Sequence, residues 1–167
     1  MTVKIGDSVP GGSLKESTGF DGVCALAPEP VDIAAAVSGK KIIVFGLPGA
    51  FTPTCSASHV PGYLEQFETF KAKGVDEIWC VAVNDAFVMA AWGANQSALG
   101  KIRFLGDGSA DWALALGLEN DLTVAGMGMR MKRFSMLLED GVVTQLNVEQ
   151  GRAFEVSDAA TMLGQLG

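Results

Sequence analysis

The sequence predicts an α/β domain with a mixed central sheet flanked by helices. Two short apolar runs, residues 41–47 and 77–83, are each followed by a segment with helical periodicity. This β-α-β-α order implies parallel strands. Two later runs with strand character flank an Asp-Gly dipeptide at residues 140–141, which is a strong signal for an antiparallel hairpin. The same sheet is therefore expected to hold both kinds of strand pair.

The first predicted strand, residues 41–47, is a continuous apolar run that Pro48 and Gly49 end. Such a run is typical of a central strand buried on both faces. A helix is expected beyond Cys55, because apolar residues recur at helical spacing until a basic last turn and the stop glycine Gly74. These apolar residues are Tyr63, Leu64, Phe67 and Phe70. Pro61 is expected to kink or interrupt the start of this helix.

The second predicted strand, residues 77–83, leads into another helix. Asn84 and Asp85 supply its N-terminal cap. Its apolar side chains are predicted to share one side, which is formed by Phe87, Val88, Ala91 and Trp92.

The C-terminal part of the chain predicts the hairpin and a last helix. Residues 133–138 and 142–148 form the two strands. Ser157 and Asp158 offer an N-cap for a helix that runs through Met162 and Leu163. Parallel β-α-β units, a later hairpin and a terminal helix make the arrangement of a thioredoxin-like α/β fold. Residues 1–167 read as a single domain, because no repeat or low-complexity tract interrupts them.

Composition restricts the classes of partner. Hydrophobic residues make up 49% of the 167 residues, charged residues 19%, and the net charge is −7. This balance is typical of a folded globular protein and disfavours a nucleic-acid partner.

No secretory signal and no uninterrupted apolar stretch of about 18 to 20 residues is present, so we expect a soluble protein without a membrane partner. Cytoplasmic localisation is the default, with an organellar matrix as the alternative if a transit peptide was removed.

The three cysteines, Cys24, Cys55 and Cys80, favour a reducing compartment, since they are few and odd in number. They form no C-x-x-C pair, and His59 is the only histidine. No metal site is therefore expected. Gly126 and Gly128 lack the third glycine of a dinucleotide-binding fingerprint, so they are interpreted as a plain loop.

The segment P-G-A-F-T-P-T-C-S, residues 48–56, carries the sharpest chemical signal. It lies between the buried strand and the first long helix, where functional residues often gather. Pro53 restricts Thr52 to extended conformations, so Cys55 should lie at or near the first helical turn. Free backbone N–H groups and the positive helix end stabilise an anion there. We therefore expect Cys55 to react as a thiolate.

This segment, continued by H-V-P-G-Y, resembles the peroxidatic loop of the type II peroxiredoxins. Residues 74–89 are similar to the next strand and helix of that family. The late hairpin of the family is similar to three further motifs, which are K-R-F-S-M at residues 132–136, D-G-V-V at residues 140–143 and L-N-V-E at residues 146–149. The resemblance covers nearly the whole chain. It implies a thioredoxin-like fold and a peroxidase that reduces hydrogen peroxide and organic hydroperoxides, in antioxidant defence and redox homeostasis.

By this resemblance, Cys55 is the catalytic nucleophile, and Thr52 and Arg133 are catalytic and substrate-binding residues. Pro48 forms a wall of the substrate site. The resemblance implies a cycle between the Cys55 thiolate and its sulfenic acid, which glutathione with glutaredoxin, or thioredoxin, reduces. It implies no bound cofactor. Relatives are commonly homodimers, which makes Phe51 and Phe87 candidate interface residues.

Several assignments stay open at this stage. Cys80 is interpreted as a buried thiol, with a resolving cysteine as the second hypothesis, and Cys24 has no assigned role. His59 is expected to make a structural hydrogen bond, rather than to form a protease-like pair with Cys55. Arg130 and Lys132 lie close to Arg133, and any of the three side chains suits a surface salt bridge.

Three alternative functions remain beside the peroxidase. A redox sensor or relay would pass the oxidation of Cys55 to partner proteins without appreciable turnover. A general thiol-disulfide oxidoreductase is disfavoured by the missing C-x-x-C pair. A non-catalytic binding module would tolerate replacement of Cys55.

Overall fold

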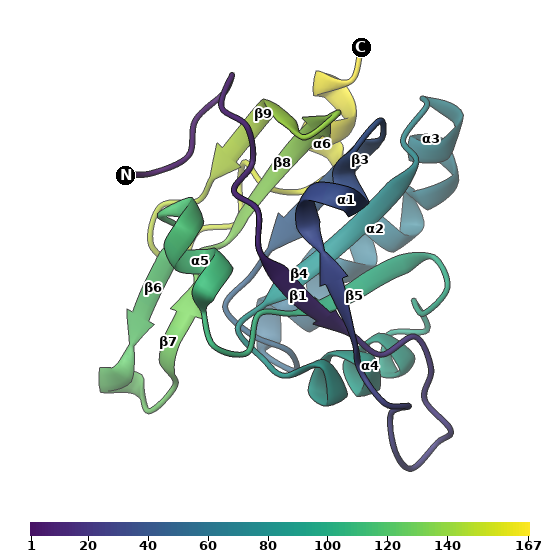
Figure 1. Ribbon diagram of the computed structural model, residues 1–167, viewed down its shortest axis with the longest axis vertical. Helices are drawn as coiled ribbons and strands as arrows, with labels where there is room; N and C mark the ends of the chain where they lie inside the picture. Colours follow the sequence, from purple (N-terminus) through teal and green to yellow (C-terminus); the bar gives the residue numbers. More distant parts are fainter.

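The computed structural model describes residues 1–167, which form one seven-stranded sheet and a separate two-stranded ribbon (Figure 1). The large sheet has the strand order β2-β1-β5-β4-β3-β8-β9, and β6 pairs with β7. The strands are β1 (Ser13–Glu16), β2 (Glu29–Asp32), β3 (Lys41–Gly46), β4 (Glu77–Ala82), β5 (Ile102–Gly106), β6 (Glu119–Leu122), β7 (Gly128–Met131), β8 (Phe134–Glu139) and β9 (Val142–Val148). The sheet is mixed, as predicted, because β3, β4 and β5 are parallel while β8 is antiparallel to β3.

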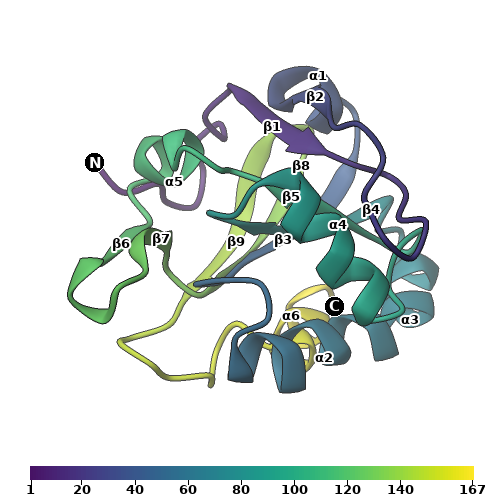
Figure 2. The ribbon, with the colours of Figure 1, turned by 90° about the horizontal axis from the view of Figure 1, so that it is seen from below.

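Helices cover both faces of the sheet (Figure 2). They are α1 (Ile33–Val37), α2 (Val60–Glu65), α3 (Phe67–Ala72), α4 (Ala86–Asn95), α5 (Asp111–Leu116) and α6 (Ala159–Gln165), with a π-helical turn at Cys55–His59 and a 3-10 turn at Thr123–Ala125. The side chains of α1 and α5 pack into one apolar core, and those of α2, α4 and α6 into another. None of the helices combines the length and apolar composition needed to span a membrane.

The predicted hairpin and terminal helix are confirmed. Strands β8 and β9 are antiparallel, with Glu139 opposite Val142. The two turn residues between them, Asp140 and Gly141, have φ angles of 49° and 77°. This left-handed conformation suits Asp-Gly. Helix α6 begins after Asp158, whose side chain accepts a hydrogen bond from the backbone N–H of Thr161.

Helix α4 begins where the sequence predicts, after the N-cap Asp85, but the four apolar residues that the sequence groups on one side are not buried together. Trp92 is buried as expected, whereas Phe87 is 55% exposed. The other buried residues are Ala86, Met89, Ala90 and Gly93. Small residues form much of this face because the helix lies close to the sheet. A Cβ atom on Gly93 would come within 2.7 Å of the Phe104 ring.

The register between β3 and β8 brings distant parts of the chain together. Because the two strands are antiparallel, the end of β3 lies beside the start of β8, with Gly46 opposite Phe134. A Cβ on Gly46 would lie 2.2 Å from the Phe134 ring, so only glycine fits there. The segment that follows β3 therefore lies next to Arg133, the residue that precedes β8.

Candidate active site

Cys55 lies at the start of the helical segment that follows β3, as predicted. The preceding residue, Thr54, already has helical angles, φ −65° and ψ −36°. The Cys55 side chain is fully buried, and its backbone N–H donates to no acceptor within the chain. A free N–H at a helix start attracts negative charge, whether on the sulfur or on a bound oxygen atom.

The helix after Cys55 does not begin as a regular α-helix. Residues Cys55–His59 form a π-helical turn, in which the N–H of Val60 donates to the carbonyl oxygen of Cys55. Pro61 follows immediately and has no N–H to donate. The wider turn accommodates this proline, which confirms the expected interruption. Single π turns within helices are frequent at functional sites.

Arg133 contacts the Cys55 sulfur directly. Its Nη2 donates to Cys55 Sγ at 3.3 Å, and its Nη1 donates to Nδ1 of His59 at 3.0 Å. The guanidinium also lies over the Phe154 ring, 5.7 Å from its centroid. No carboxylate forms a salt bridge with it. Its positive charge is therefore available to the sulfur and to any anion beside the sulfur.

His59 is buried beneath this arginine. Its Nε2 lies 3.1 Å from the carbonyl oxygen of Ser157, so the predicted structural hydrogen bond is confirmed. Both ring nitrogens have partners other than Cys55. Burial, with the positive charge of Arg133, lowers the pKa of His59 from 6.5 to about 3.

This shifted pKa predicts an acid-dependent loss of stability. Between pH 6.5 and about 3 the unfolded chain binds a proton on His59 that the folded chain does not bind. The free energy of unfolding should therefore fall as the pH falls through this window, by up to about 1.4 kcal/mol per pH unit. Above pH 6.5 the group contributes no pH dependence.

Urea unfolding of the native chain and of a His59→Asn variant, measured across this window, tests the expectation. The native chain should show the steeper dependence on pH, since asparagine does not titrate. Equal slopes for the two chains would contradict a buried, neutral imidazole.

Three hydrogen bonds hold the loop before Cys55 in place. The Thr52 hydroxyl donates to the carbonyl oxygen of Gly49 at 2.7 Å and makes no hydrogen bond with Cys55. The N–H of Ala50 donates to Asn84 Oδ1 at 2.9 Å, and Arg130 Nη1 donates to the carbonyl oxygen of Pro48 at 3.3 Å. Thr52 is half-buried, and its hydroxyl lone pairs remain able to accept a hydrogen bond.

The other two cysteines have contrasting environments. Cys80 lies in the middle of β4, fully buried in the apolar core that also contains Cys55. Burial, together with the nearby Cys55, raises the pKa of the Cys80 thiol well above its ordinary value. Cys24 is exposed in an early loop, and all three cysteines are free thiols.

Two further interactions at the site were not predicted from the sequence. The Glu149 carboxylate accepts hydrogen bonds from the N–H groups of Glu155, Val156 and Ser157, each at 2.8 Å. Trp92 Nε1 donates to the Ser56 hydroxyl at 3.0 Å. The L-N-V-E motif was the available signal for Glu149, but spacing alone does not reveal which backbone groups its side chain reaches.

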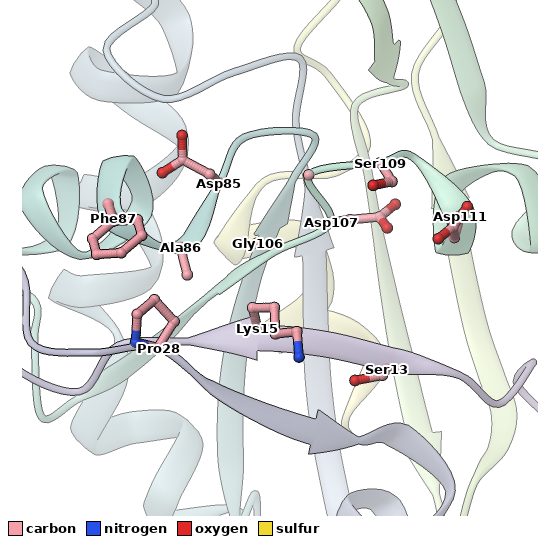
Figure 3. A pocket seen from close by; sticks show the side chains of 11 residues that line it. Ser13, Lys15, Pro28, Asp85, Ala86, Phe87, Gly106, Asp107, Ser109 and Asp111 are labelled. Atoms are coloured by element: carbon pink, nitrogen blue, oxygen red, sulfur yellow. The ribbon is translucent and has the colours of Figure 1, made fainter.

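A surface cavity of about 390 Å³ lies away from these residues, beside Lys15 on β1 and Phe87 on α4 (Figure 3). None of the predicted site residues lines it. Two of its carboxylates make local hydrogen bonds: Asp85 caps α4, and Asp107 accepts hydrogen bonds from the N–H groups of Trp112 and Ala113.

Comparisons with known proteins agree with this arrangement. The Redoxin family matches residues 4–163. Peroxiredoxin-2B of Arabidopsis thaliana is 48% identical over 98% of both chains. Reduced Prx3 of Vibrio vulnificus in complex with hydrogen peroxide has a TM-score of 0.91 and 43% identity, with 99% of this chain and 100% of that chain covered. Peroxiredoxin 5 of Alvinella pompejana has a TM-score of 0.84 and 31% identity, with 98% and 97% covered. The chain therefore belongs to the peroxiredoxin family, in its type II group, and is a thiol-dependent peroxidase with an antioxidant function.

Proposed function

We propose that Cys55 is the nucleophile that attacks the peroxide, and that Thr52 and Arg133 activate the substrate beside it. The observation that carries this proposal is the 3.3 Å hydrogen bond from Arg133 Nη2 to Cys55 Sγ at the start of a helix. A guanidinium without a carboxylate partner keeps its positive charge available to this sulfur and to the oxygen atoms of a bound peroxide. Pro48 is proposed as a wall of the substrate site.

The reaction follows from the positions of these groups. The Cys55 thiolate attacks one oxygen atom of ROOH, and the O–O bond breaks. Because Thr52 donates its own proton to Gly49, its oxygen is free to accept a hydrogen bond from the peroxide O–H. Arg133 and the N–H of Cys55 stabilise the departing oxyanion, which takes up a proton to become ROH.

The products of this step are ROH and the sulfenic acid of Cys55. Two thiols then reduce the sulfenic acid, which gives a disulfide, water and the original Cys55 thiolate after loss of a proton. Hydrogen peroxide and organic hydroperoxides are the proposed substrates. A reducing partner must therefore reach Cys55 from solvent.

We propose a one-cysteine cycle in which Cys80 stays a thiol. Cys80 is fully buried in a central strand, and its raised pKa disfavours the thiolate that would attack a sulfenic acid. A Cys55–Cys80 disulfide is the second hypothesis for Cys80, and both side chains are fully buried in the same apolar core. Glutathione with glutaredoxin, or thioredoxin, is the proposed electron donor.

Steady-state turnover of the native chain, Cys80→Ser and Cys24→Ser tests this cycle, with each reductant supplied in turn. We expect all three chains to reduce hydrogen peroxide within about twofold of one another, because neither replaced thiol takes part. Loss of turnover in Cys80→Ser, with a Cys55–Cys80 disulfide in the oxidised native chain, would show that Cys80 resolves. Oxidation of Cys55 without turnover by either reductant would favour the redox relay.

Assembly and localisation are proposed on separate grounds. We propose a homodimer through Phe51 and Phe87, each 55% exposed, with the Phe51 ring 6.4 Å from Trp92 of α4. A sedimentation mass equal to one 17.4 kDa chain at micromolar concentration would contradict it.

We propose that residues 1–167 act as one domain. We also propose that the protein is located in the cytoplasm, where free thiols persist. Accumulation of a tagged chain in an organelle would contradict that location.

A further inference from the structure

Arg130 joins the two-stranded ribbon to the active-site loop. Its Nε donates to the carbonyl oxygen of Met127 at 2.9 Å, within the connection between β6 and β7. Its Nη1 donates to the carbonyl oxygen of Pro48 at 3.3 Å, in the loop that follows β3. The side chain is half-buried and forms no salt bridge. Its hydrogen bonds therefore go to backbone carbonyl groups rather than to a surface carboxylate.

Asn84 holds the same loop two residues further on. Its Oδ1 accepts a hydrogen bond from the N–H of Ala50 at 2.9 Å. Asn84 does not cap α4 as the sequence predicts, because Asp85 supplies the side chain that accepts from the N–H of Val88. The Asn84 side chain thus serves the active-site loop rather than the helix.

Gly49 lies between these two contacts, and both of its peptide groups are held. The carbonyl of Pro48 and the N–H of Gly49 belong to one planar group, which Arg130 binds. The carbonyl of Gly49 and the N–H of Ala50 belong to the next planar group, which Asn84 binds. Glycine has the most conformational freedom of any residue. The two side chains therefore restrict the backbone where it could turn most easily.

The side chains of Arg130, Asn84 and Thr52 meet around this glycine. A Cβ atom at position 49 would lie 2.7 Å from Arg130 Nη1, 3.4 Å from Thr52 Cγ2 and 3.7 Å from Asn84 Oδ1. Any larger residue would displace Arg130 Nη1. The glycine thus allows the arginine to approach the loop closely.

The direction of the Gly49 carbonyl determines where the Thr52 hydroxyl can accept a hydrogen bond. The hydroxyl donates its one proton to this carbonyl oxygen at 2.7 Å, so its two lone pairs point elsewhere. A carbonyl that turned away would leave the hydroxyl without this acceptor and free to rotate. The Thr52 proton would then compete with the peroxide O–H, which the Thr52 oxygen has to accept.

We propose that Arg130 and Asn84 are positioning residues for the Thr52 hydroxyl. They fix the peptide groups on the two sides of Gly49 and so direct the Thr52 oxygen at the peroxide. This role rests on the one proposed above for Thr52. Neither residue is assigned a contact with the peroxide or with the Cys55 sulfur. The β6–β7 ribbon gains a function, which is to carry Arg130 to the active-site loop.

Two replacements remove the two contacts separately. Arg130→Met removes the donors but keeps an unbranched side chain, and Asn84→Leu removes the acceptor with little change of shape. We expect stopped-flow oxidation by hydrogen peroxide to slow about 5- to 30-fold in each variant. Lys132→Met is the matched control, because Lys132 is exposed and lies two residues from Arg130. It loses the same charge as Arg130→Met and should keep the native rate.

Alkylation of Cys55 by iodoacetamide gives a readout that separates positioning of Thr52 from a merely structural role. This reaction uses the same sulfur but needs no acceptor for a peroxide O–H. Both variants should therefore be alkylated at the native rate, measured by mass spectrometry. A loosened loop would expose the buried sulfur and speed alkylation. Circular dichroism checks the fold, and Arg130→Leu replaces Arg130→Met if that chain does not fold.

A double-mutant cycle with Thr52→Val tests whether the two residues act through Thr52. In a chain that already carries Thr52→Val, neither Arg130→Met nor Asn84→Leu should slow the reaction with peroxide further. Losses that add to that of Thr52→Val would overturn the positioning role. A changed alkylation rate in either variant, or a loss in Lys132→Met equal to that in Arg130→Met, would also overturn it.

The same rates distinguish this role from the one on which it rests. If Thr52→Val itself reacts with peroxide at the native rate, the proposed function of Thr52 fails. A slow Thr52→Val chain, with a native rate in Arg130→Met or Asn84→Leu, would remove only the positioning role.

Discussion

Replacement of Cys55 with serine is expected to lower the rate of hydrogen peroxide reduction by about 10⁴-fold or more. A serine hydroxyl is almost wholly protonated at neutral pH, and the Arg133 guanidinium, 3.3 Å from the sulfur in the native chain, cannot supply the missing nucleophile. The remaining rate should equal that of the direct reaction between peroxide and reductant. A coupled assay with saturating thiol reductant measures it.

The control for this variant is Cys24→Ser, which removes an exposed thiol far along the chain from the active-site loop. It should keep the native rate. A Cys55→Ser chain that folds, as judged by circular dichroism, and retains more than about a tenth of the native rate would contradict the assignment of the nucleophile.

Replacement of Arg133 with glutamine is expected to lower the second-order rate constant for hydrogen peroxide by about 10²- to 10³-fold. The side chain provides the only charged hydrogen bond to the Cys55 sulfur. Its replacement removes this hydrogen bond and weakens the stabilisation of the departing oxyanion. Stopped-flow fluorescence of the reduced chain, mixed with peroxide in excess, gives the rate constant directly.

Arg152→Gln is the matched control, because Arg152 is exposed and forms no salt bridge. Both variants lose one positive charge, so a general effect of net charge would slow them equally. A native rate in Arg133→Gln, or an equal loss in Arg152→Gln, would contradict the role proposed for Arg133.

The parts of the fold that could be predicted are those whose signals are local. The apolar run of β3, the cap at Asp85 and the Asp-Gly turn at residues 140–141 each determine a short segment by its own chemistry. The position of Cys55 at the start of a helix followed in the same way from Pro53 and the strand before it. Local sequence therefore predicted the type of these elements and the place of the nucleophile.

The contacts between distant residues could not be predicted in this way. Arg133 lies beside Cys55 because β3 and β8 pair in one register, with Gly46 opposite Phe134. The bond from Arg133 to His59 joins residues 74 positions apart. Such contacts depend on the assembled sheet, and only the resemblance to a family singled out Arg133 among its basic neighbours.

The exposure of Phe87 on helix α4 was not predicted from the sequence, for a different reason. The sequence interpretation grouped Phe87 on one side of the helix with Trp92, yet the Phe87 ring is 55% exposed whereas Trp92 is buried. The close packing of the helix against the sheet requires small residues such as Gly93. Hydrophobic periodicity reports which side chains are apolar, and it does not report how close two elements approach.

Mass spectrometry of the reduced chain after one equivalent of hydrogen peroxide, with a sulfenic-acid trap present, tests the central claim most directly. The trap should add rapidly and stoichiometrically at Cys55, and it should do so equally in the Cys80→Ser variant. Peptides that contain Cys24 and Cys80 should remain unmodified. If Cys55 stays reduced while peroxide is consumed, or if the trap adds first at another cysteine, the proposed mechanism is wrong.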